Sequence, residues 1–85
     1  MTLRYVSGTD AHPARVAVAT TRAAGNAVAR NRVRRRLRAA VAAHQAELNS
    51  GGAYLFAAGR DAITIPFDTL TAAVGELVGS VREAA

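Results

Sequence analysis

Residues 22 to 38 constrain this chain most, because they must carry a dense run of arginines and still pack on a core. They hold seven of the eleven basic residues, all of which are arginine, and no carboxylate lies between Asp10 and Glu47. An arginine guanidinium binds phosphate through fixed, paired donors, whereas the more compact lysine is absent from the chain. The uncompensated cluster therefore predicts a polyanionic partner.

The apolar residues in and after this run have helical spacing. Asn26 is a typical N-cap, and Gly51 and Gly52 are typical of a helix stop, so we expect a helix from Asn26 to about Leu48. Its apolar stripe is formed by Val33, Leu37, Ala40, Val41 and Leu48. The opposite face carries Asn31, Arg34, Arg35 and Arg38, with Arg32 and Arg36 on its shoulder. One helix is thus expected both to anchor in the core and to bind.

Short strands are expected on both sides of this helix. Residues 3 to 7 have the pattern of a strand that ends in a turn at residues 8 to 10, and residues 15 to 20 alternate with period two. After the helix, residues 53 to 58 predict another strand, and residues 62 to 65 are expected to extend or follow it.

A second helix is predicted to open at Pro66. Its apolar stripe is formed by Phe67, Leu70, Val74, Leu77, Val78 and Val81. Gly75 and Gly79 lie inside this helix, and each costs about 1 kcal/mol relative to alanine, so we expect its end to fray. The predicted order is strand, strand, helix, strand, helix.

The remaining residues show no sign of a protein active site. The carboxylates stand singly, and neither a nucleophile elbow nor a phosphate-cradling glycine loop is present. His12 is expected at the surface, and His44 is expected to pack near the helix stripe. The chain has no cysteine, and no apolar run approaches the roughly 18 residues of a membrane span, so we expect a cytoplasmic location.

A motif on the predicted arginine helix resembles a known family signature. It begins with Gly25-Asn26-Ala27-Val28, continues with Arg30-Asn31-Arg32, and ends with Arg34-Arg35 and Leu37-Arg38. In type, order and spacing it is similar to the signature of the bacterial ribonuclease P protein component, and Arg22 falls where that family usually has a basic residue. The resemblance implies an α+β fold like that of ribosomal protein domains, with a small mixed sheet, helices on one side and a rare left-handed crossover.

The same resemblance implies a function. Members of the family are the protein subunit of ribonuclease P, an endoribonuclease that removes the 5′ leader from precursor tRNA during tRNA 5′ maturation. The catalytic RNA carries the chemistry and mainly holds the Mg²⁺ ions, so no catalytic or metal-binding residue is expected in the protein. The implied partners are that RNA and precursor tRNA, without DNA or a membrane. We expect a protein monomer within a ribonucleoprotein.

By this resemblance, the residues that contact RNA are Arg22, Asn26, Arg30, Asn31, Arg32, Arg34, Arg35, Arg36 and Arg38. Arg30 lies near the apolar stripe, so ordering the helix start is an alternative role for it. Aromatic rings usually hold unpaired bases, which makes Tyr5 a candidate for contact with the leader. Tyr54 and Phe56 would join it only if they face outward, and core packing is expected for Phe56 and Phe67.

The sequence also departs from the family pattern. Family members usually have another helix before the first strand, and that helix forms the leader cleft together with the sheet. Here Met1 stands almost at the first strand, so we interpret residues 1 to 85 as one RNA-binding domain that is short at its N-terminus. An inactive, truncated member of the family is therefore an alternative interpretation.

Other classes of protein share a basic helix. A ribosomal component, or another structural RNA-binding protein, would need no preference for the ribonuclease P RNA. A DNA-reading helix fits less well, because strands flank this helix on both sides. A membrane-surface helix also fits less well, because its apolar stripe is mostly valine and alanine.

Overall fold

The computed structural model describes residues 1–8 and 12–84, so most of the predicted turn at residues 8 to 10 lies outside the described part of the chain. The strands are β1 (Thr2–Val6), β2 (Arg15–Thr20) and β3 (Ala53–Ala58). The helices are α1 (Ala27–Ala42), α2 (Asp61–Thr64) and α3 (Phe67–Ala84), with single turns of 3-10 helix at Arg22–Ala24 and Gln45–Glu47. The strands follow one another along the chain in the predicted order. β1 starts and ends one residue earlier than predicted.

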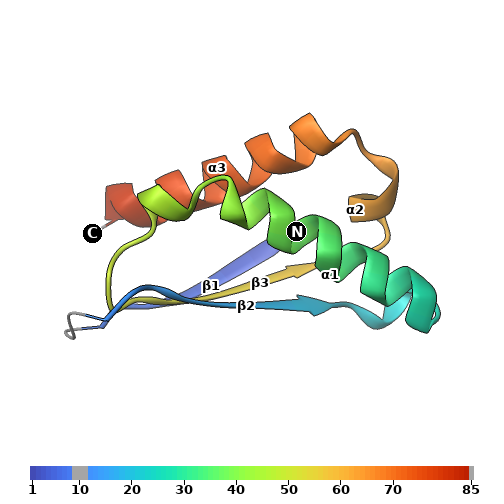
Figure 1. Cartoon of the computed structure of the whole chain (residues 1–85), viewed down its shortest axis with the longest axis horizontal. Coiled ribbons are helices and arrows are strands. Elements are labelled where there is room, and N and C mark those ends of the chain that lie inside the picture. Colours follow the sequence, from blue (N-terminus) through green and yellow to red (C-terminus); the bar gives the residue numbers. More distant parts are fainter. Residues whose placement is uncertain (9–11, 85) are drawn as a thin grey trace.

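The three strands form a mixed sheet in the order β1-β3-β2. β1 runs antiparallel to β3, with Tyr5 opposite Tyr54, and β2 runs parallel to β3, with Val18 opposite Phe56. A parallel pair needs a crossover connection, and α1 supplies it. Figure 1 shows α1 and α3 on the same side of the sheet. The predicted α+β architecture, with helices on one side, is thus confirmed.

The core lies between this sheet and the two long helices. Tyr54 and Phe56 are buried and face the helices, whereas Leu55, which alternates with them, is exposed on the other side. The buried residues of the helices are Val33, Leu37, Ala40 and Val41 from α1, and Leu70, Val74 and Val78 from α3. Both predicted stripes therefore supply the core. Phe67 was expected in the core as well, but this residue is 40% exposed.

The other face of the sheet has no covering layer among the described residues. We call it the open sheet face; its side chains come from Arg4, Val6, Arg15, Ala17, Ala53 and Leu55. Val6 is 67% exposed and Leu55 is 38% exposed. Apolar and basic side chains thus share one accessible surface.

α1 begins as predicted but ends earlier. Asn26 is its N-cap, and the Asn26 side chain accepts a hydrogen bond of 3.0 Å from the Ala29 amide. The helix ends at Ala42 and not near Leu48, because His44 leaves helical geometry with φ −114° and ψ 17°. The prediction missed a tertiary contact that holds His44 in this position.

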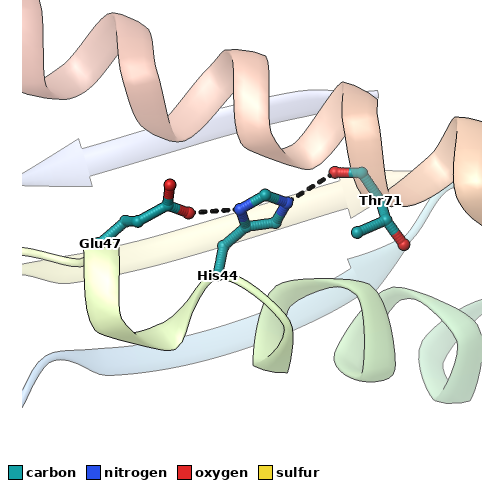
Figure 2. Close-up of polar contacts among 3 residues, drawn as sticks. All are labelled: His44, Glu47 and Thr71. Atoms are coloured by element: carbon teal, nitrogen blue, oxygen red, sulfur yellow. Dashed lines mark hydrogen bonds and ion pairs between the residues drawn. The ribbon is translucent and has the colours of Figure 1, made fainter.

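His44 joins the end of α1 to α3 (Figure 2). Its Nε2 lies 2.9 Å from the Thr71 carbonyl oxygen, and its Nδ1 contacts the Glu47 carboxylate. The ring thus lies between an oxygen atom of α3 and the carboxylate of the turn that follows α1. His44 is therefore a packed residue, as the sequence predicted, with a structural role.

Residues 62 to 65 do not extend β3, which corrects the expectation that they continue this strand. They lie in and just after the short helix α2, where Ala62 is buried. β3 pairs with β2 as far as Ala58 and with β1 as far as Ala57. A longer β3 would leave its backbone groups without a neighbouring strand, so the chain turns into a helix instead.

α3 is continuous to Ala84 through both of its glycines. Fraying of its end stays a prediction. Gly75 lies against the His44 ring, where an added Cβ would stand 2.7 Å from Cε1. Gly79 has open space, with nothing within 4 Å of an added Cβ. None of the described helices is long and apolar enough to cross a membrane.

These two glycines give a matched pair of substitutions. Gly79→Ala should raise the free energy of unfolding by about 0.5 to 1 kcal/mol, because alanine favours the helix. Gly75→Ala should be less stable than Gly79→Ala by about 1 to 3 kcal/mol, because its Cβ displaces His44 from Thr71. Urea denaturation measures both.

The double variant His44→Ala/Gly75→Ala controls for the cause. With the ring removed, Gly75→Ala should become stabilising relative to His44→Ala alone. If Gly75→Ala and Gly79→Ala instead stabilise equally in the presence of His44, the contact between His44 and α3 contributes nothing to stability.

Candidate nucleic-acid interface

The outer face of α1 gathers most of the predicted binding residues. We call the set Asn31, Arg32, Arg34, Arg35 and Arg38 the arginine surface. All of them are exposed except Arg34, which is half-buried. They are held outward because the opposite stripe of the same helix is buried in the core.

The arginine surface carries charge that no carboxylate compensates. Among residues 1–8 and 12–84, the single ion pair joins His44 to Glu47, and no arginine takes part in one. Within α1, Arg34 Nη1 donates a hydrogen bond of 2.9 Å to Asn31 Oδ1. The remaining donors of these side chains face solvent and are free to meet an anion.

The start of α1 adds further basic residues. Arg22 is exposed in the 3-10 turn just before the helix. Gly25 follows with φ 107°, a backbone conformation that favours glycine, and leads into the Asn26 cap. No acidic residue lies in the first turn of α1, so the positive end of the helix dipole is unopposed there.

Arg60 belongs to this end of α1 and was missed by the sequence reasoning. It precedes α2, and its Nη1 would lie 3.7 Å from a Cβ placed on Gly25. Arg60 stands alone in the sequence, 35 positions after Gly25, so no local pattern marks it. Its exposed guanidinium extends the basic surface around the helix start.

Arg36 differs from these arginines because its guanidinium is bound within the fold, and its contact with RNA stays a prediction. Its Nε donates to the Ala62 carbonyl oxygen at 2.7 Å, and its Nη2 donates to the Ile65 carbonyl oxygen. Its guanidinium also lies over the Phe67 ring, 5.9 Å from the centroid. Arg36 therefore fastens the corner between α2 and α3 to α1.

Arg30 occupies an intermediate position, as its place near the stripe predicted. The residue is half-buried, and its Nε is buried without a hydrogen-bond partner among the described residues. Ordering the start of the helix and contacting RNA both stay open as roles for Arg30.

Tyr5 lies on the helix side of the sheet and not on the open sheet face. Its ring packs 4.8 Å from the ring of Tyr54, and its hydroxyl accepts a hydrogen bond of 3.3 Å from Asn49 Nδ2. Tyr54 and Phe56 are buried on the same side, so neither faces outward. Contact of the half-buried Tyr5 with a nucleic acid stays a prediction, and it would be made from this side of β1.

The open sheet face offers a second basic surface. A depression of about 380 Å³ lies there, and the side chains on this face that line it are Arg4, Val6, Arg15, Ala17, Ala53 and Leu55. Val16 and Tyr54 also border it, although their side chains lie on the helix side of the sheet. Two arginines beside aliphatic side chains suit a single-stranded nucleic acid, because its phosphates can contact the arginines while its bases contact the apolar side chains. In the described part of the chain, no three His, Asp or Glu side chains gather as metal ligands would.

The comparisons with known proteins agree on one family. The family model described as Ribonuclease P matches residues 1–82. A ribonuclease P protein component from Gluconacetobacter diazotrophicus is 39% identical over 84 residues, which cover 99% of this chain and 71% of that protein.

Two solved structures are similar to this fold. The RNase P protein from Thermotoga maritima matches with a TM-score of 0.75 and 15% identity, covering 89% of this chain and 72% of that one. The Staphylococcus aureus RNase P protein matches with a TM-score of 0.73 and 15% identity, covering 93% and 72%. At this identity the likeness concerns the fold alone.

Substitution of Arg36, which is bound within the fold, and of an exposed arginine of α1 should affect stability differently. Arg36→Ala should lower the free energy of unfolding by about 1 to 3 kcal/mol, because it leaves the carbonyls of Ala62 and Ile65 without their donor. Arg35→Ala, one position earlier on the exposed side, should stay within about 0.5 kcal/mol of the parent. Equal melting temperatures for the two variants would contradict the structural role of Arg36.

Proposed function

The chain belongs to the ribonuclease P protein family, and we propose that it binds the catalytic RNA of ribonuclease P through the arginine surface of α1. As a ribonuclease P protein component, it is a subunit of an endoribonuclease and acts in tRNA 5′ maturation. The observation that supports the proposed contact is the uncompensated charge: Arg32, Arg35 and Arg38 are exposed, and no described carboxylate pairs with them.

The contribution of the protein is electrostatic. Phosphates crowded in a folded RNA repel one another and repel an incoming precursor tRNA, and arginines placed among them reduce this repulsion and release condensed counterions. The entrance to α1 extends the same contact through Arg22, Asn26 and Arg60. The RNA carries the phosphodiester chemistry in this proposal, and Mg²⁺ is held mainly by the RNA.

We further propose that the open sheet face meets the single-stranded 5′ leader of precursor tRNA. The support is the pairing of aliphatic side chains such as Leu55 with Arg4 and Arg15 at the rim. Because the arginine surface lies on the helix side, the two RNA partners would occupy different faces of the molecule. A cytoplasmic location and a single protein copy in the ribonucleoprotein stay predictions.

The central test is cleavage of precursor tRNA by a bacterial ribonuclease P RNA at low magnesium, where the RNA alone is slow. The wild-type protein should stimulate cleavage, and Arg32→Ala/Arg35→Ala should lose most of this stimulation, because two charges leave the RNA contact. Arg82→Ala, which removes an exposed arginine from α3, serves as the control and should keep the stimulation. Tight RNA binding by the wild-type protein without stimulation would support the alternative of an inactive family member.

The leader contact has its own test. Arg4→Ala/Arg15→Ala should weaken binding of precursor tRNA to the holoenzyme about tenfold, the effect of two lost phosphate contacts, and should leave mature tRNA unaffected. Filter binding with both tRNAs measures the difference. Equal weakening for precursor and mature tRNA would mean that the open sheet face does not meet the leader.

A further inference from the structure

Val28 is an exposed apolar residue in the middle of the basic region. It lies in the first turns of α1 and is 69% exposed, although valine is a weaker helix former than alanine. It lines a depression of about 440 Å³ together with Asn31, Arg34, Arg35 and Arg38.

A hydrogen bond to Arg34 fixes the orientation of the Asn31 side-chain amide in this depression. Arg34 has only donors, so the atom of the Asn31 amide that faces it at 2.9 Å must be the oxygen. The Asn31 Nδ2 therefore keeps both of its hydrogens for another partner. Asn31 can thus donate hydrogen bonds to an acceptor on a ligand.

The charge of the depression selects the kind of partner. Three arginines line it and no carboxylate does, so an anionic group is favoured. The partner must combine an apolar surface for Val28, an acceptor for Asn31 and a phosphate for Arg35 or Arg38. A nucleotide has all three, in the form of a base face, a base edge or ribose oxygen, and a phosphodiester.

We infer that this depression seats one unpaired nucleotide of the catalytic RNA, an inference that rests on the proposed function and makes its contact specific. The base face lies on Val28, and Asn31 donates to an acceptor on the base or the ribose. Arg35 and Arg38 bind the flanking phosphates. A paired nucleotide cannot occupy the seat, because its base faces are covered by stacking within the helix.

The salt dependence of binding separates this contact from ordinary ionic attraction. The affinity of the wild-type protein, Val28→Ala and Arg38→Ala for the catalytic RNA, without tRNA, is measured over a range of salt concentrations. Val28→Ala should weaken binding about three- to tenfold at every salt concentration, since it removes only apolar contact. Arg38→Ala should lower the slope of log affinity against log salt by about 0.7 to 0.9, as one lost phosphate contact requires.

Thr69→Ala is the matched control for Val28→Ala. It also truncates an exposed, branched side chain on a helix, but on α3. It should leave the RNA affinity unchanged. Alanine favours the helix more than valine, so unfolding of α1 cannot account for a loss caused by Val28→Ala.

Chemical probing of the bound RNA identifies the nucleotide. One or a few unpaired bases should be protected by the wild-type protein and become reactive again with Val28→Ala, while the other protections persist. No such base, or a Val28→Ala variant that behaves like Thr69→Ala or changes the salt slope, would overturn the nucleotide seat. If Arg38→Ala also left affinity and slope unchanged, the proposed contact of the arginine surface with the RNA would fail as well.

Discussion

The packing of the α1 stripe on the sheet is the constraint on which the rest of the structure depends. Val33, Leu37 and Val41 are buried, and their burial fixes the rotation of the helix about its own axis. A helix of 16 residues that is locked in this way has no freedom over which side chains face solvent. The exposure of the arginines is therefore a consequence of core packing, and it precedes any contact with RNA.

Much of this arrangement could be predicted because it is local. The Asn26 cap, the bounds of β2 and β3 and the α1 stripe all follow from patterns a few residues long. The exposed arginines follow from the same helical period. The family signature added the expectation of a mixed sheet, which periodicity alone could not supply.

What the sequence did not reveal depends on contacts between distant residues. Arg36 donates hydrogen bonds to carbonyl oxygens 26 and 29 positions away, which sets it apart from the other arginines of α1. His44, where α1 ends, contacts the carbonyl oxygen of Thr71, 27 positions away. The alternation of side chains along β3 predicted that Tyr54 and Phe56 share one face. It could not predict that the helices cover this face and leave Leu55 exposed on the other. The side of the sheet on which Tyr5 lies was uncertain for the same reason.

The sheet with a single covered face makes the molecule thin. The two shorter extents of its Cα trace are 22 and 18 Å. The arginine surface belongs to a helix that covers one face of the sheet, and the open sheet face is the other (Figure 1). At physiological ionic strength the screening length is about 8 Å, so charges separated by roughly two such lengths hardly sense each other. With the two proposed RNA contacts in place, the protein would act as a spacer that holds two polyanions near each other, yet far enough apart for solvent ions to suppress their mutual repulsion.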